Sequence, residues 1–130
     1  MKNKKIVNLL VFVLLATLLT GCGASPGKVV QNFFQAVDNG EIEESMSYLS
    51  TSTLQALGTE KWRIALVEIS NQMTMQGGLK SVKVIEESVN GEIAQITVNI
   101  MMKDGTEELD SINMIKENGD WKISLDPWSK

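Results

Sequence analysis

The sequence predicts an α+β fold, in which N-terminal helices pack on a curved, four-stranded antiparallel meander. Apolar residues recur every three or four positions as far as residue 76, and every second position from Leu79 onward. This change of period marks the point where helices give way to strands. Three turn signals then divide the second half of the chain into four segments. The signals are Asn90-Gly91, Asp104-Gly105 and Asn118-Gly119.

The helical half carries recognisable start and stop signals. Ser25 and Pro26 are typical of a helix start, with serine as the N-cap and proline in the first helical position. Gly40 is placed to end that helix, and Thr59 is placed to cap a longer one. The predicted helices span residues 26–39, a shorter segment that begins at Glu41, residues 54–57 and residues 60–75.

The strands are predicted over residues 79–89, 92–103, 106–117 and 121–126. A two-residue turn at the third turn signal pairs Met114 with Ile123 and Ile112 with Leu125, all on one apolar face. A two-residue turn at the second signal would mix polar and apolar faces, so a three-residue loop over 104–106 is predicted there. This loop gives three pairs: Val98 with Ile112, Ile96 with Met114, and Ile100 with Asp110.

A separate leader precedes the predicted domain. A basic head is followed by an apolar run from Ile6 to Leu19, which ends in the sequence Leu-Thr-Gly-Cys at Cys22. The run of about 14 residues is shorter than a membrane span of roughly 20, and it has the length of a removable export signal. The pattern resembles a bacterial lipoprotein signal. The resemblance implies cleavage between Gly21 and Cys22 and a diacylglycerol group on the Cys22 sulfur.

Two alternatives for the leader stay open. The apolar run could remain as an uncleaved anchor, and Cys22 could be a free thiol or pair with another chain. On the lipoprotein interpretation, the chain divides into a signal peptide over 1–21, a lipidated tether over 22–27 and an α+β domain over 28–130. The expected location is extracytoplasmic, on the cell membrane or on the outer membrane if the host has one.

Composition excludes several classes of function. The net charge is −4, and removal of the three leader lysines lowers it to −7, so nucleic acid is not an expected partner. Anionic lipid headgroups would also repel this acidic domain. We therefore expect acyl chains on Cys22, and not a basic patch, to contact the bilayer. The chain contains no histidine, the commonest general base and metal ligand, so we expect neither a metal site nor a cofactor.

Several stretches together resemble a known family. They are Ser25-Pro26, residues 33–40 (Phe-Phe-Gln-Ala-Val-Asp-Asn-Gly), Tyr48-Leu49-Ser50, and residues 116–123, which contain Gly119-Asp120-Trp121-Lys122-Ile123. They resemble small bacterial lipoproteins that carry a nuclear-transport-factor-2-like (NTF2-like) domain of unknown function, in the cystatin-like superfamily. The resemblance implies a strongly bent sheet wrapped around helices, which in this superfamily often encloses a pocket.

Eight residues are candidates to line such a pocket: Tyr48, Trp62, Ile96, Val98, Ile100, Asp110, Ile112 and Met114. The same set describes a filled hydrophobic core, and we expect the core, with a ligand cavity as the alternative.

Three functions follow as hypotheses. The first, which we expect, is a non-enzymatic binding module for a small apolar ligand or an envelope protein. The second is a proton-transfer enzyme, similar to isomerases and dehydratases of the superfamily, in which Asp110 and Tyr48 would act. The third is a structural protein that forms a homodimer through the outer sheet face, where Thr97, Asn99 and Met101 are expected.

Overall fold

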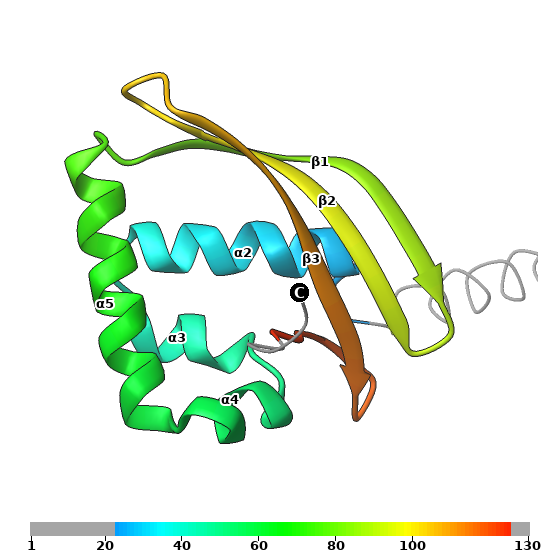
Figure 1. Ribbon diagram of the computed structural model, residues 1–130. Helices are drawn as coiled ribbons and strands as arrows, with labels where there is room; N and C mark the ends of the chain where they lie inside the picture. The colour runs from blue at the N-terminus through cyan, green and yellow to red at the C-terminus, as the bar shows by residue number, and fades with distance from the viewer. Residues whose placement is uncertain (1–22, 126–130) are drawn as a thin grey trace, which may run out of the picture.

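The computed structural model describes residues 23–125. The chain forms four helices and then a sheet whose strand order is β1-β2-β3-β4, with every neighbouring pair antiparallel. The helices are α2 (Pro26–Asp38), α3 (Ile42–Ser47), α4 (Thr51–Leu57) and α5 (Thr59–Met75). The strands are β1 (Leu79–Asn90), β2 (Ile93–Met102), β3 (Glu107–Glu117) and β4 (Asp120–Ile123). The sheet curves over α2 while α5 crosses one end (Figure 1), so the predicted α+β meander is confirmed.

Helix α2 begins and ends at the predicted signals. The Ser25 side chain caps it by accepting a hydrogen bond from the Lys28 amide, and Pro26 is the first helical residue. Gly40 follows the helix with a φ of +72°, a conformation that glycine adopts without steric cost. Pro26 and Gly27 are buried residues of α2. The folded domain therefore begins within the segment that the sequence assigned to the tether.

Thr59 is not a cap. Gly58, with a φ of +92°, stands between α4 and α5 and is the N-cap of α5, and no side chain caps that helix. The Gly58 amide also donates to the Leu54 carbonyl, so one glycine both ends α4 and begins α5. Its positive φ, which glycine adopts without steric cost, changes the direction of the chain between the two helices.

The register between β3 and β4 is partly as predicted. Met114 pairs with Ile123, but the strand ends there, so the expected pair of Ile112 with Leu125 does not form. The chain turns instead toward the helices, because the Leu125 amide donates to Thr53 Oγ1 at 2.8 Å. An isolated parallel bridge between Leu49 and Ile123 joins the same region to the end of α3.

The predicted register between β2 and β3 is wrong by two residues. Val98 pairs with Asp110, Ile96 with Ile112, and Ala94 with Met114. The loop has three residues, as predicted, but they are Lys103-Asp104-Gly105, because the Met102 amide donates to the Thr106 carbonyl. Gly105 has a φ of +91°, which supplies the left-handed residue that three-residue hairpin loops require.

A shift of two residues leaves each side chain on its predicted face, because side chains alternate with a period of two. The inner face of β2 and β3 therefore still forms the core, together with α2 and α5. The most deeply buried apolar residues are Val30, Val37, Leu66, Ile96, Val98, Met114 and Ile123.

Three hydrogen bonds fix α2 along the edge strand β1. The Gly27 amide donates to Glu87 Oε1 at 2.7 Å, Gln31 Nε2 donates to the Val82 carbonyl at 3.0 Å, and the Leu79 amide donates to Asp38 Oδ1 at 2.9 Å. Their order shows that α2 and β1 run in opposite directions. The start of α2 therefore lies beside the end of β1, and the end of α2 beside the start of β1.

Candidate functional site

Most of the predicted pocket residues belong to the packed core. Ile96 and Val98 are fully buried on β2, and Ile112 and Met114 are buried opposite them on β3. They pack against residues of the helices as one buried hydrophobic cluster. Of the eight predicted residues, only Ile100 lines the candidate pocket described below.

The two aromatic candidates have structural contacts. Trp62 on α5 is half-buried, and its indole Nε1 donates to the Thr53 carbonyl at 2.8 Å, which joins α5 to α4. Tyr48 follows α3 and lies in a shallow depression between α2 and α3, where its hydroxyl donates to Glu44 Oε1 at 3.2 Å. Burial, and then the hydrogen bond to Glu44, raise the pKa of Tyr48.

Asp110 is exposed on β3 opposite Val98, and its Oδ1 accepts a hydrogen bond from the Ser111 amide at 2.8 Å. The predicted position beside Ile100 is therefore wrong, because the β2–β3 loop lies one residue earlier than expected. Asp110 lies on the sheet whereas Tyr48 lies outside it between two helices, and they line no common pocket among residues 23–125.

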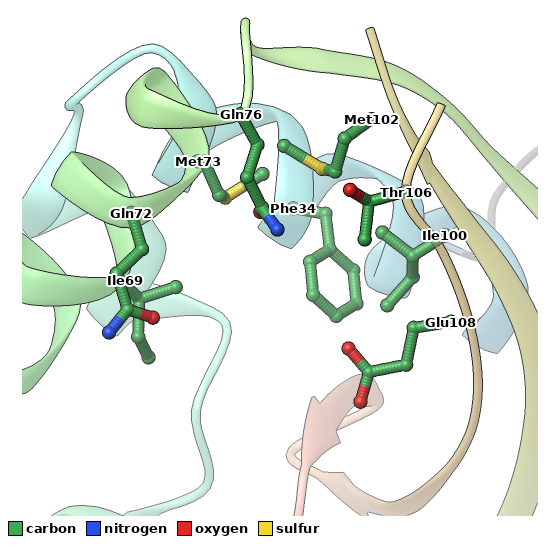
Figure 2. A pocket seen from close by; sticks show the side chains of 9 residues that line it. All are labelled: Phe34, Ile69, Gln72, Met73, Gln76, Ile100, Met102, Thr106 and Glu108. Atoms are coloured by element: carbon green, nitrogen blue, oxygen red, sulfur yellow. The ribbon is translucent and has the colours of Figure 1, made fainter. Parts of the chain in front are cut away.

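A pocket of about 150 Å³ lies where the second half of α5 faces the loop end of β2 and β3. Figure 2 shows its lining, in which the Phe34 ring of α2 stands between side chains of α5 and side chains of the sheet. The lining residues are Phe34, Ile69, Gln72, Met73, Gln76, Ile100, Met102, Thr106 and Glu108.

The pocket has an apolar floor and a polar rim. Phe34 is held by an edge-to-face contact with Phe33, whose ring centroid is 5.3 Å away at an interplanar angle of 76°. Met73 and Met102 bring flexible, polarisable thioethers that adapt to ligands of different shape. The polar groups are the side chains of Gln72, Gln76, Thr106 and Glu108.

Glu108 is the functional candidate that the sequence did not predict. It pairs with Ile100, the position that the predicted register gave to Asp110. Within residues 23–125 its carboxylate forms no hydrogen bond or ion pair, and no lysine or arginine of this part of the chain lines the pocket. The signal that could have identified it is Gly105, since a left-handed glycine in the third loop position fixes the observed register.

The outer face of the sheet carries both polar and apolar side chains. Thr97, Asn99 and Met101 lie there, as predicted for a dimer surface. The Asn99 side-chain amide donates to Glu107 Oε1, and the Gln95 side-chain amide donates to Asn113 Oδ1 at 3.4 Å, whereas the buried Asn99 Oδ1 has no hydrogen-bond partner among the described residues. Two apolar side chains on this face are largely exposed: Leu109, which pairs with Asn99, is 68% exposed, and Ile93, which pairs with Ile115, is 58% exposed.

The acidic residues near α3 have structural partners. Asp38 Oδ1 accepts from the Leu79 amide, and Glu43 accepts from Arg63, which lowers the pKa of Glu43. Among the residues that the structure describes, no group of three or more acidic or cysteine side chains is placed to hold a metal ion. Over the same residues, no helix is long and apolar enough to cross a membrane.

The helices, the bent antiparallel sheet and the pocket at its open end define an NTF2-like domain. A crystal structure described as a "Putative NTF2-like transpeptidase" from Campylobacter jejuni matches with a TM-score of 0.70 and 19% identity, over 79% of this chain and 100% of that chain. The chain belongs to the family described as "Domain of unknown function (DUF4878)", which matches residues 20–124. No curated protein matches the chain in sequence.

Proposed function

We propose that the protein is a lipid-anchored, non-enzymatic binding module on the outer side of a cell membrane. The observation that carries the anchor is the position of Cys22, which ends the lipoprotein-like leader and is separated by only three residues from Pro26, the first residue of α2. An extended tether of three residues spans about 10 Å. Acyl chains on Cys22 would therefore hold the start of α2 close to the bilayer surface.

The fold supports a direction for the pocket relative to this anchor. A Cβ atom on Gly23 would lie 3.2 Å from Asp120 Oδ1, so the chain enters the domain beside the start of β4. Helix α2 then runs for 13 residues, about 20 Å, toward the end where α5 and the β2–β3 loop form the pocket. The pocket would open away from the membrane, toward ligands in the surrounding aqueous space.

The chemistry of the described residues favours binding over catalysis. Glu108 is the only titratable side chain that lines the pocket, and it has no partner there that could serve as a second acid or base. The pair proposed for proton transfer, Asp110 and Tyr48, is not brought together.

The transpeptidase name belongs to the Campylobacter jejuni protein, whose 19% identity supports a shared fold alone. Acyl transfer requires a nucleophile that a neighbouring base activates. Between residues 23 and 125, no serine hydroxyl forms a hydrogen bond with a lysine or carboxylate side chain. The Thr51 hydroxyl donates to Glu117 Oε2 at 3.0 Å, but this pair is exposed and neither residue lines the pocket. The lone cysteine is the proposed lipid attachment site. These observations support a binding role for the domain.

The anchor is tested by mass spectrometry of the full chain after expression in a bacterial host. We expect a mature protein that begins at Cys22, carries diacylglycerol and sediments with membranes. The Cys22→Ser variant should lose the lipid and the cleavage, and Ser25→Ala should retain both, because Ser25 caps α2 and lies outside the lipid box. An unmodified wild-type chain in the soluble fraction would refute the anchor.

A further inference from the structure

We propose that the pocket receives a lysine or arginine side chain from a partner polypeptide. This inference rests on the proposed binding function and names the ligand that the pocket fits. Its volume of about 150 Å³ is below the roughly 300 Å³ at which pockets for drug-sized molecules begin. The space suits a single long side chain, so the partner is a polypeptide that inserts one residue.

The floor and the rim of the pocket favour different parts of the partner's inserted side chain. Phe34, Met73 and Ile100 offer an apolar surface, which favours a hydrocarbon stem. Glu108 places a carboxylate at the rim, and a docked partner would shield it from water. A leucine or phenylalanine of the partner would fill the floor but leave that charge without a counterion, which is unfavourable.

Lysine and arginine satisfy both requirements, because each has an apolar stem and a cationic head. The Phe34 ring can attract the cation through its π-system, and the amide oxygens of Gln72 and Gln76 can accept hydrogen bonds from it. Figure 2 shows the Glu108 carboxylate and these amides on different sides of the same opening. A cation between them would be contacted from both α5 and β3.

A second carboxylate lies on the same face of β3 as Glu108. Asp110 follows Glu108 by two residues on β3 and is therefore on the same face of the strand. The mature chain has the net charge of −7 described above. Negative potential around a concave site raises the rate at which a basic partner associates with it.

The test uses methionine-methyl NMR of the full lipidated chain in phosphatidylcholine nanodiscs. Met73 and Met102 report on the pocket, while the buried core residue Met46 is an internal control. The probes are pentapeptides Gly-Gly-X-Gly-Gly, in which X is lysine or its uncharged isostere norleucine. We expect both to shift the two pocket methyls, with the lysine peptide bound about fivefold more tightly, as for a partly exposed ion pair.

Two variants of equal charge isolate the role of Glu108. Glu108→Gln should abolish the preference for lysine and leave norleucine binding unchanged. Glu107→Gln removes a charge from the outer face of the same strand and should retain the preference. Equal binding of the two peptides to the wild-type chain, or equal effects of the two variants, would overturn the cation inference.

A further measurement distinguishes a polypeptide ligand from a small amine. If pentylammonium alone binds as tightly as the lysine peptide, the ligand is a small amine and the polypeptide assignment is wrong. If no probe shifts Met73 or Met102, the pocket does not bind ligands, and that part of the proposed function fails as well. The anchor is tested separately by the mass of the mature chain.

Discussion

Tyr48 is the only tyrosine in the chain, so its ionisation can be followed without interference from another phenol. Burial and the hydrogen bond to Glu44 favour the neutral phenol, and we expect a pKa above the usual value near 10. The unfolded chain, with its lower pKa, then loses the proton first. The free energy of unfolding should therefore fall as the pH rises through and above about 10.

An absorbance titration at 295 nm measures this pKa directly. Glu44→Gln should lower the midpoint, because it removes both the acceptor charge and its repulsion of the phenolate. A midpoint that the variant leaves unchanged would show that burial alone sets the pKa.

Thr53 connects α4 to the segment that follows β4. Its Oγ1 accepts hydrogen bonds from the Leu125 amide and from Ser50 Oγ, both at 2.8 Å, and only 1% of Thr53 is exposed. Thr53→Val keeps the shape but leaves the Leu125 amide without this acceptor. We expect a loss of about 1–3 kcal/mol in the free energy of unfolding.

Urea unfolding followed by tryptophan fluorescence tests that value, since the Trp62 indole donates to the Thr53 carbonyl. The matched control is Thr74→Val on the exposed side of α5, where the hydroxyl only donates to the Ser70 carbonyl of its own helix. The control should change stability by less than about 0.5 kcal/mol. Equal losses in the two variants would assign the effect to the valine substitution itself.

At the scale of elements, the β2–β3 loop sets the register that places Glu108, and not Asp110, in the pocket. Gly105 has a φ of +91°, and a Cβ atom there would meet nothing within 4 Å. Gly105→Ala should therefore cost about 1 kcal/mol through backbone strain alone. Gly105→Asn should cost less, because asparagine adopts left-handed conformations more readily than alanine. Thermal unfolding of the two variants would rank them, and the opposite order would contradict this account of the loop.

The same loop shows what the sequence could and could not predict. Alternating apolar residues and Asx-Gly pairs identified the strands, the turns and the inner face of the sheet. The exact loop residues depend on contacts distant in sequence, because the Lys103 amide donates to the Gly78 carbonyl at 2.9 Å and the Asp104 amide donates to the Gln76 carbonyl at 3.0 Å. An error of two residues in register preserves every face but exchanges Asp110 for Glu108 beside Ile100.

Helix α5 shows a second limit. Its spacing predicts that Leu66, Ile69 and Met73 share one buried face, and Leu66 and Met73 are indeed buried. Ile69 is 40% exposed, because the sheet bends away from this end of the helix and leaves the pocket between them. The period of a helix identifies its apolar face, but the curvature of the sheet decides how much of that face is covered.

At the scale of the whole molecule, the proposed anchor and the pocket lie at opposite ends of α2. The hydrogen bond between Gly27 and Glu87 holds the start of the helix against the end of β1, beside the β1–β2 turn. The bond between Asp38 and Leu79 holds its other end near the pocket. Figure 1 shows the β1–β2 turn and the β2–β3 loop at opposite ends of the sheet. A lipid-anchored molecule should therefore present the pocket to the solution.

This orientation can be measured with a single fluorophore, because the one native cysteine would be acylated and an introduced cysteine would be the only free thiol. Thr106→Cys places the label at the pocket rim, and Val89→Cys places it at the β1–β2 end, where the side chain is 55% exposed. Quenchers within the bilayer act only over short distances, and the two ends differ by about 20 Å. We expect strong quenching at position 89 and little at position 106. Equal quenching would mean that the domain lies flat on the membrane and that the pocket faces ligands along its surface.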